Sequence, residues 1–290
     1  VKPVDAQNTL IPAVRRAIEH KRLVARNRFL ESQLEAAQRA RGMVGDSAAM
    51  RQVSALVSAV ATAEVTVLVL GESGTGKELV ARALHEQSER SGRPFIDVNC
   101  AALTDSLLES ELFGHMKGSF TGATSNRKGL FETASSGTLF MDEVGELSPT
   151  TQARLLRVLQ EGTIRPVGST ESRRVDVRVI AATNRDLAKE VEAGRFRQDL
   201  FYRLNVFTID LPPLRDRRED IPMLVDHFLH KHGLRLGRPV PQVDTATMDA
   251  LSSHSWPGNV RELENTVERA LVLCRSDVVT VDLLPPSFRD

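Results

Sequence analysis

A run of eight residues near position 75 has the types and spacing of a loop that binds phosphate groups. It reads Gly71-Glu-Ser-Gly-Thr-Gly-Lys-Glu78 and fits the pattern G-x-x-x-x-G-K. Glycines let the backbone curl so that its N–H groups point inward at phosphate oxygens, and the lysine adds a positive charge. The residues with this expected role are Gly71, Glu72, Ser73, Gly74, Thr75, Gly76, Lys77 and Glu78. The pattern by itself also fits a glycine-rich turn with a surface lysine.

The flanking sequence favours the phosphate loop over the simple turn. Val65–Leu70 (VTVLVL) is an apolar and mostly β-branched run, as expected of a strand buried on both faces of a sheet. A helical stretch opens at Lys77, and the N-terminus of a helix adds positive potential where phosphates would lie. A strand, the loop and a helix in this order form the context in which the pattern binds a nucleotide.

Two acidic residues at the end of another apolar run could complete the chemistry. Gly137–Glu143 reads GTLFMDE, so Asp142 and Glu143 end a predicted strand. Asp142 could hold Mg²⁺ directly or through water, and Glu143 could polarise an attacking water as a general base. Glu78 stands where such a loop usually has a Ser or Thr that binds Mg²⁺, so Glu78 either binds the metal or leaves that role to others. The alternative for Asp142-Glu143 is a surface turn.

A third apolar run, Val177–Ala182, ends in Thr183-Asn184. A polar side chain at the end of this strand could sense the γ-phosphate of a nucleotide. Asn184 fits equally well as the cap of a turn before a helix that starts near Asp186. The sequence leaves both interpretations open.

These motifs belong to strands and helices that alternate after Gly42. We expect strands at Val65–Leu70, Phe95–Cys100, Thr138–Met141, Val177–Ala182 and Val206–Leu211, and helices at Lys77–Ser88, Ser106–Leu112 and Pro149–Glu161. This alternation predicts an α/β fold with a parallel β-sheet core. After Leu211-Pro-Pro the strand pattern stops, and three stretches read as helices: Ile221–His232, Thr245–Ser253 and Asn259–Cys274. We therefore expect an α/β subdomain at 42–214 and a small all-α domain at 215–290.

Composition sets broad limits on the kind of protein. Hydrophobic residues make up 41% and charged residues 26%, which is ordinary for a globular protein. The 38 basic and 38 acidic residues balance, so bulk charge does not predict a protein that coats nucleic acid. Cys100 and Cys274 lack metal-binding spacing, which favours reduced thiols. Because no apolar run could span a bilayer and no signal peptide is evident, we expect a cytoplasmic protein without membrane contact.

Residues 1–41 have a different character. Val14–Arg41 has no Gly or Pro and is rich in helix-forming residues, which predicts a continuous helix. Leu23, Leu30 and Ala37 repeat every seven residues, and this spacing indicates a short coiled coil whose companion positions are interrupted. The predominantly basic charges fit a solvated helix face better than a nucleic-acid contact.

Together, the motifs resemble the central AAA+ domain of sigma-54-dependent transcriptional activators, the NtrC/DctD-like response regulators. The resemblance covers about residues 42–290 and is most specific at Gly118-Ser-Phe-Thr-Gly-Ala123, which matches the signature GAFTGA except at Ser119. Glu111-Leu-Phe-Gly-His115 matches the family's ELFGH just before it. The resemblance implies that this loop contacts sigma-54, with Phe120 and Thr121 central. The implied contact residues are Gly118, Ser119, Phe120, Thr121, Gly122 and Ala123.

The residues of this loop leave two readings open when the resemblance is set aside. A lone Phe between glycines fits an exposed tip that contacts a partner, and it also fits a side chain tucked into the core beneath the loop.

The resemblance also implies roles for residues of the nucleotide site. GESGTGKE is the family's own form of the loop, so Glu78 is no defect, and the implied cofactors are ATP and Mg²⁺. Asn99 resembles the residue that holds the catalytic glutamate in a nucleotide-dependent switch, and Asn184 resembles the first sensor. Asp142 and Glu143 take the metal-holding and catalytic roles.

Three arginines complete the implied site. Arg197 and Arg203, in the segment Phe196–Leu204, are similar to the arginine fingers that reach the neighbouring subunit. A guanidinium suits this task because it is always charged and spreads its donors over phosphate oxygens. Arg261, in Trp256-Pro-Gly-Asn-Val-Arg261, resembles the second sensor and would reach the nucleotide from a helical lid. The alternative for each arginine is a surface ion pair.

The N-terminus carries a second resemblance. Val1-Lys-Pro-Val-Asp5 and a helix to His20 look like the end of a response-regulator receiver domain, so we expect a receiver tail at 1–20 and a linker helix at 21–41. The phosphoacceptor aspartate of a two-component system would lie upstream. DNA contact is expected only through the helix-turn-helix domain that usually follows in the family and that this sequence does not contain.

Three hypotheses of function remain in play. The first is an ATPase that acts on sigma-54 RNA polymerase holoenzyme and remodels the closed promoter complex, as a dimer when inhibited and a hexamer or heptamer when active. The second is another AAA+ protein-remodelling ATPase, and the 118–123 sequence argues against it. The third is a non-catalytic interaction module. Three histidines on one predicted helix, His227, His230 and His232, match no metal-binding motif.

Overall fold

The computed structural model describes residues 43–119, 124–237 and 240–288. The expected receiver tail, linker helix and coiled coil lie outside the described residues, as do Phe120, Thr121, Gly122 and Ala123. Residues 45–290 form one compact unit, and the description below concerns this unit.

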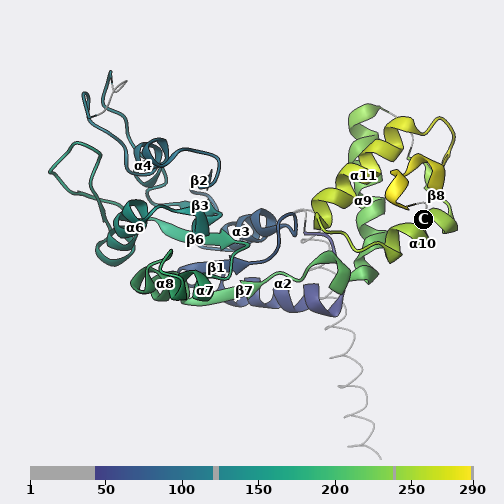
Figure 1. Ribbon diagram of the computed structural model, residues 1–290, viewed down its shortest axis with the longest axis horizontal. Coiled ribbons are helices and arrows are strands. Elements are labelled where there is room, and N and C mark those ends of the chain that lie inside the picture. Colours follow the sequence, from purple (N-terminus) through teal and green to yellow (C-terminus); the bar gives the residue numbers. More distant parts are fainter. Residues whose placement is uncertain (1–42, 120–123, 238–239, 289–290) are drawn as a thin grey trace, which may run out of the picture. The chain divides into compact units, whose positions relative to one another are not determined.

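A five-stranded, wholly parallel sheet forms the centre of the first part of this unit (Figure 1). Its strands, in spatial order, are β2 (Phe95–Asn99), β3 (Thr138–Asp142), β6 (Arg178–Thr183), β1 (Val67–Leu70) and β7 (Phe207–Asp210). The expected α/β class and parallel core are confirmed, and each predicted strand is present with its ends shifted by at most two residues. The strand order differs from the chain order, so residues from distant segments end at the same edge of the sheet.

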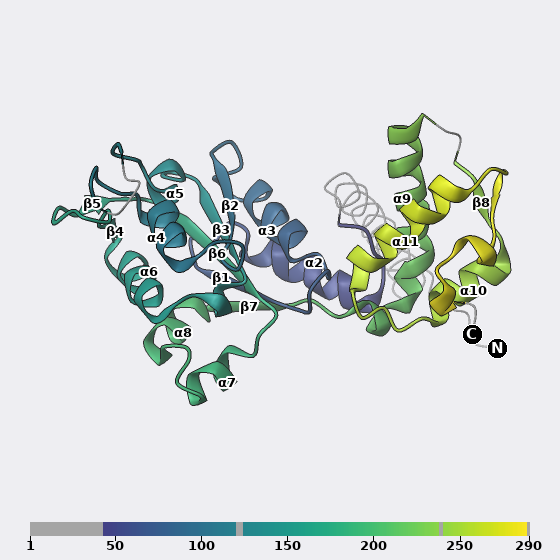
Figure 2. The same ribbon diagram turned by 45° about the horizontal axis from the view of Figure 1, so that its top comes forward.

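Helices cover both faces of the sheet (Figures 1 and 2). Two helices, α2 (Ala48–Val60) and α3 (Lys77–Glu86), contact strands from one side. The opposite face is covered by α4 (Asp105–Phe113), α5 (Leu130–Thr133), α6 (Pro149–Glu161) and α8 (Gln198–Leu204), with α7 (Leu187–Glu192) packed against α8. Sequence reasoning did not predict α2, although its buried Met50, Val53 and Val57 recur at helical spacing.

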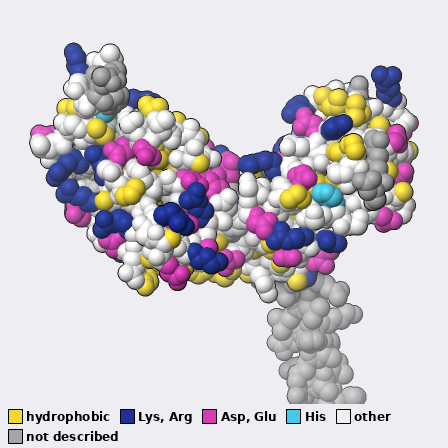
Figure 3. Space-filling view, in the orientation of Figure 1, with side chains coloured by type: hydrophobic (Ala, Val, Ile, Leu, Met, Phe, Trp, Pro, Cys, Tyr) yellow, Lys and Arg dark blue, Asp and Glu magenta, His cyan; other side chains and the backbone are white. Residues whose placement is uncertain are grey.

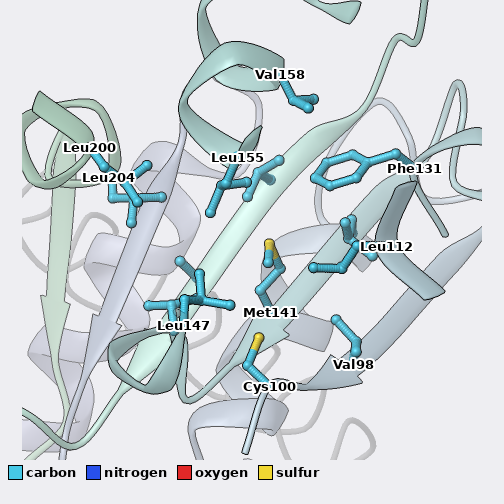
Figure 4. Packing of buried hydrophobic residues seen from close by; sticks show 14 of the residues in the cluster. Val98, Cys100, Leu112, Phe131, Met141, Leu147, Leu155, Val158, Leu200 and Leu204 are labelled. Atoms are coloured by element: carbon cyan, nitrogen blue, oxygen red, sulfur yellow. The ribbon is translucent and has the colours of Figure 1, made fainter. Parts of the chain in front are cut away.

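The alternation of side chains along each strand builds two apolar layers. Met141 of β3 joins the large cluster beneath α4, α5 and α6, together with Leu112, Phe131 and Leu155 (Figure 4). Phe140 is equally buried but precedes Met141 by one residue, so it points to the opposite face, beneath α3. A sheet with both faces buried explains why its strands read as continuous apolar runs rather than alternating ones.

Local signals set the helix ends. The Ser148 side chain accepts a hydrogen bond from the N–H of Thr151, Pro149 occupies the first turn, and Gly162 ends α6 in the left-handed conformation. The predicted bounds of this helix, Pro149–Glu161, are therefore those observed. A short antiparallel pair, β4 (Thr163–Ile164) with β5 (Arg173–Arg174), follows and was not predicted.

The C-terminal part is helical, as expected, but it is not wholly so. Its helices are α9 (Ile221–Leu236), α10 (Thr245–Ser253) and α11 (Asn259–Leu273), and they follow the short 3₁₀ turns η3 (Leu214–Asp216) and η4 (Arg218–Asp220). β8 (Gln242–Val243) and β9 (Val278–Val279) form a two-residue parallel pair that the all-α expectation missed. Helix α9 runs past His232 and ends where Gly237 takes a left-handed conformation. The remaining 3₁₀ turns are η2 (Val144–Glu146), η5 (Val281–Leu283) and η6 (Pro286–Phe288).

Two surface properties complete the description. Within the described residues, no helix has the length and apolar character needed to cross a membrane. Basic and acidic side chains are interspersed over the face seen in Figure 3.

Candidate functional site

The phosphate loop connects β1 to α3 in a conformation that requires glycine. Gly74 has a φ of 79° and Gly76 has a φ of 105°, both in the region that L side chains rarely adopt. A Cβ on Gly74 would lie 2.3 Å from the carbonyl oxygen of Gly258, so the close approach excludes any larger residue. Helix α3 begins at Lys77, and the N–H groups of a first helical turn have no partner within the helix. The loop therefore presents N–H donors and positive potential at its centre.

Lys77 folds back over this loop. Its Nζ donates hydrogen bonds to the carbonyl oxygens of Gly71 at 3.0 Å and Glu72 at 3.3 Å. The Lys77 side chain is only 6% exposed, and its Nζ lies 3.6 Å from Oε1 of Glu143. The cation is thus held at the mouth of the loop, between the loop backbone and a carboxylate from another strand.

The parallel register brings the two acidic residues to this place. β3 ends at Asp142 next to Asn99 of β2, while Thr183 at the end of β6 is aligned with Leu70 at the end of β1. The carboxyl ends of the strands therefore meet at one edge, where ligands bind in open α/β sheets.

Asp142 and Glu143 have different surroundings. Burial, followed by the neighbouring charge of Glu143, raises the pKa of Asp142, while Lys77 acts in the opposite direction. The Oδ1 of Asp142 accepts a hydrogen bond from the N–H of Glu143. Glu143 itself has a φ of 55°, an uncommon left-handed conformation for a side-chain-bearing residue. Its Oε2 accepts a hydrogen bond from the N–H of Asn184 at 3.2 Å. Such strained residues concentrate at functional sites.

The two asparagine candidates lie on either side of this glutamate. Asn184 follows β6 and contacts Glu143 through its backbone. Asn99 ends β2, and its Oδ1 accepts a hydrogen bond from the N–H of Ala101 at 2.9 Å. In the described residues the carboxylate of Glu143 is held by Lys77 and Asn184, and the switch role of Asn99 stays a prediction.

The donor set fits a nucleotide phosphate with Mg²⁺. Loop N–H groups and Lys77 suit phosphate oxygens, and the carboxylate of Asp142 is a ligand of the kind that Mg²⁺ prefers. Glu78 is a poorer candidate for the metal, because Arg82 binds its Oε1 through Nε at 3.0 Å and through a terminal nitrogen at 2.8 Å. No described group of three or more His, Cys, Asp and Glu side chains forms a separate metal site.

The candidate finger arginines contact other groups within this chain. Arg197 makes a bidentate ion pair with Asp199, and this pair raises the pKa of Arg197. Arg203 donates two hydrogen bonds to the carbonyl oxygen of Leu159 at 3.0 and 2.7 Å. The buried amide of Gln152, which sequence reasoning missed, fixes this segment by accepting from the N–H of Arg197 at 2.8 Å.

The C-terminal part contacts the phosphate loop through residues that the sequence did not single out. The N–H of Arg261 donates to the carbonyl oxygen of Gly74 at 3.3 Å, whereas the predicted reach of the Arg261 side chain to a nucleotide stays a prediction. Arg215, Arg217 and Asn259 also bind the loop, although no motif marked them. The only signal for Asn259 was its place between Trp-Pro-Gly and a helix, a position where Asn commonly adopts a left-handed conformation.

The predicted partner-binding loop is described only at its base. His115 and Arg127 exchange backbone hydrogen bonds of 3.0 and 2.9 Å and hold the two ends of the loop together. Gly118 has a φ of 81°, and the buried Oγ of Ser119 has no hydrogen-bond partner among the described residues. An alanine at position 119 would leave no unpaired hydroxyl, which agrees with the family signature.

The three histidines of α9 have ordinary surroundings. His230 lies beside Asp226 at 3.3 Å. His232 is buried, and its ring nitrogens lie 3.2 Å from Glu264 and 3.7 Å from Glu268 of α11. Burial lowers the pKa of His227.

Comparisons with known proteins identify the family of the chain. Residues 43–210 match the family described as the Sigma-54 interaction domain, and residues 215–290 match the AAA+ ATPase lid domain. The chain is 59% identical over 244 residues to the transcriptional regulatory protein ZraR of Klebsiella oxytoca, a match that covers 84% of the chain and 55% of ZraR. It is 56% identical over 242 residues to the Nif-specific regulatory protein of Azotobacter vinelandii, covering 83% of the chain and 46% of that protein.

A solved structure is similar over almost the whole chain. NtrX from Brucella abortus in complex with ATP superimposes with a TM-score of 0.80 and 39% identity, covering 99% of this chain and 62% of NtrX. The chain therefore spans between about half and three fifths of the length of these relatives.

Proposed function

The chain belongs to the family of sigma-54 interaction domains, joined to an AAA+ lid, and from this membership we propose that it hydrolyses ATP to activate RNA polymerase carrying sigma-54. One observation carries the proposal: Lys77 of the phosphate loop and Glu143 at the end of β3 face each other at 3.6 Å. A phosphate-binding cation and a general base then lie at one sheet edge, as phosphoryl transfer to water requires.

Each residue of the site has a distinct task in this proposal. The N–H groups of 71–78 and the charge of Lys77 bind and orient the phosphates, and Asp142 helps to hold Mg²⁺. ATP supplies the phosphoanhydride bond whose hydrolysis releases the energy. Glu143 orients a water molecule and accepts its proton, while the N–H of Asn184 steadies the carboxylate.

The neighbouring subunit completes the site. We assign Arg197 and Arg203 as the arginine fingers of that subunit, because both lie on an exposed segment. Their present partners are Asp199 and the carbonyl oxygen of Leu159, and each arginine can exchange its partner for a phosphate group. Arg261 contributes from the lid, and Asn99 and Asn184 report the nucleotide state. The active assembly in this proposal is a ring of six or seven subunits, and the inhibited form is a dimer.

The 118–123 loop transmits the energy to sigma-54. The backbone bridge between His115 and Arg127 gives the loop a firm base, and Phe120 and Thr121 make the contact. The protein works in the cytoplasm with the polymerase holoenzyme, and DNA is bound by a separate helix-turn-helix domain.

Phosphate release, measured over a series of protein concentrations, tests the proposal. We expect the specific activity to rise steeply with concentration, because each site needs two subunits. We also expect the protein to bind isolated sigma-54 when a transition-state analogue of ATP hydrolysis occupies the site. ATP turnover without sigma-54 binding would favour another AAA+ remodelling ATPase, and the absence of any turnover would overturn the enzyme assignment.

A further inference from the structure

Four successive residues of the phosphate loop are each bound by residues that follow the sheet. Glu72, Ser73, Gly74 and Thr75 all contact groups from 214–217 or 258–261. These contacts are separate from those of Lys77, whose Nζ binds the carbonyl oxygens of Gly71 and Glu72 and lies beside Glu143. The C-terminal part of the chain is therefore bonded directly to the phosphate loop.

The carboxylate of Glu72 is the centre of these contacts. Arg215 binds it with both terminal nitrogens, at 2.6 Å to Oε1 and 2.8 Å to Oε2. Asn259 donates a further hydrogen bond to Oε2 at 3.1 Å. These bonds, that of Arg215 above all, lower the pKa of Glu72 to about 2. The Glu72 carboxylate is therefore bonded to residues that follow the sheet, and we look for its role in that contact.

Asn259 links the same carboxylate to the start of the lid. It is fully buried, has a φ of 53°, and begins α11. Its Nδ2 also donates to the carbonyl oxygen of Ser73 at 3.0 Å, and its Oδ1 accepts from the N–H of Leu214 at 2.8 Å. One amide thus joins the loop, the end of the sheet domain and the helix that carries Arg261.

The next two loop residues are held through their carbonyl oxygens. The N–H of Arg261 donates to the carbonyl oxygen of Gly74, and the buried Arg217 donates to the carbonyl oxygen of Thr75 at 2.9 Å. The bonds from Asn259 to Glu72 and Ser73 and from Arg261 to Gly74 all come from the start of α11, so this end of the helix is tied to the loop at three places.

We propose that Glu72 is a positioning residue that couples the phosphate loop to the lid and thereby holds Arg261 beside the nucleotide. Its carboxylate binds Arg215 and Asn259, which fixes the start of α11 against the loop. The role concerns the affinity for nucleotide rather than the hydrolytic step, because Glu72 touches neither Glu143 nor Asp142. This inference rests on the proposed function, since it concerns the same nucleotide site.

A double-mutant cycle tests the coupling. The variants are Glu72→Gln, Arg215→Gln and the double variant, and the probe is a fluorescent ADP analogue whose Kd is measured by anisotropy. Glu72→Gln preserves the shape of the side chain and one oxygen acceptor for Asn259. We expect each single change to raise the Kd about five- to tenfold, and the double change to raise it no further. Arg215→Lys keeps the charge but loses the bidentate geometry, so its Kd for the ADP analogue should lie between those of wild type and Arg215→Gln.

Steady-state kinetics separate positioning from general destabilisation. KM should rise in parallel with Kd, whereas kcat at saturating ATP and high protein concentration should stay within about twofold of wild type. Melting curves exclude unfolding at the temperature of the assay.

The ion pair Glu190–Arg195 provides the matched control, because it is also bidentate, with bonds of 2.7 and 2.8 Å, and it joins two residues outside the phosphate loop. Glu190→Gln and Arg195→Gln should leave the Kd unchanged. Normal nucleotide binding by wild type with an unchanged Kd in Glu72→Gln, or strictly additive single effects, would overturn the coupling alone. A wild-type protein that binds no adenine nucleotide would overturn both this inference and the proposed function.

Discussion

Asp142 and Glu143 are neighbours in sequence, yet the fold gives their carboxylates different partners. Glu143 is turned by its left-handed backbone toward Lys77 and Asn184. Asp142 stays half-buried at the end of β3, close to the charge of Glu143. Paired carboxylates in unlike surroundings are how one site separates a metal-holding role from a proton-accepting role.

The base role predicts that Glu143→Gln keeps nucleotide binding but loses turnover. An amide can still accept from Asn184, but it cannot take a proton from water. We expect phosphate release to fall by about 100-fold or more, with the Kd for ATP within about threefold of wild type. Filter binding and phosphate release measure the two quantities. Turnover above a tenth of the wild-type rate would remove Glu143 from the base role.

The substitution Asp142→Asn should raise the melting temperature of the nucleotide-free protein at neutral pH, although it lowers the rate of ATP hydrolysis. The pKa of Asp142 is raised in the folded state, so folded protein binds this proton more tightly than unfolded protein does. Stability from this group is present at low pH and is lost as pH rises through the folded pKa. At pH 7 the variant should therefore melt about 1–3 °C higher than wild type, and the gain should shrink as pH falls toward 4. A lower Tm of the variant at neutral pH would contradict the view that the charged Asp142 carboxylate destabilises the folded protein.

At the scale of elements, two glycines hold the base of the 118–123 loop. A Cβ on Gly129 would lie 2.4 Å from the nitrogen of Gly114 and 2.5 Å from the carbonyl oxygen of Leu112. These neighbours are backbone atoms and cannot move aside independently. The segments 112–115 and 127–129 can therefore pack together only with glycine at this position.

Gly129→Ala should consequently separate nucleotide binding from partner binding. We expect a loss of about 2 kcal/mol or more in the free energy of unfolding, because the extra methyl group forces the two segments apart. Binding to sigma-54 with the transition-state analogue should fall more than tenfold, while the Kd for nucleotide changes less than threefold. Gly92→Ala is the control, because a Cβ there meets no atom within 4 Å. Equal loss of both activities would indicate general unfolding instead.

At the scale of the whole molecule, the residues with proposed catalytic roles lie in different places. Glu143 lies at the sheet edge, whereas Arg197 and Arg203 bind Asp199 and Leu159 within their own chain. If the site is shared between subunits, one subunit supplies the base and the next supplies the guanidinium.

A mixing experiment tests this division. Glu143→Gln and Arg203→Ala should each be nearly inactive alone. Mixed in equal amounts, they should recover about a quarter of the wild-type rate, because a random ring forms that fraction of interfaces with both groups intact. Phosphate release from the mixture gives the answer. A rate equal to the mean of the two single variants would place the finger and the base in the same subunit, or remove Arg203 from catalysis.

The sequence determined the local features of this protein. The phosphate loop, the strand that ends in Asp142 and the helix Pro149–Glu161 could all be predicted, because neighbouring residues fix them through backbone dihedrals, caps and side-chain alternation. The family resemblance could also be recognised from the motifs at 71–78 and 118–123, whose residues are contiguous.

Only the tertiary structure decided which of these features meet. The order of strands places β3 beside β6 and β6 beside β1, and this order brings Glu143 to Lys77. The contacts of Glu72 with Arg215 and Asn259 join residues more than 140 positions apart and follow no local pattern. Long-range contacts depend on how whole elements pack, and the free energy of that packing is spread over many buried side chains. No short stretch of sequence therefore contains the information that places them together.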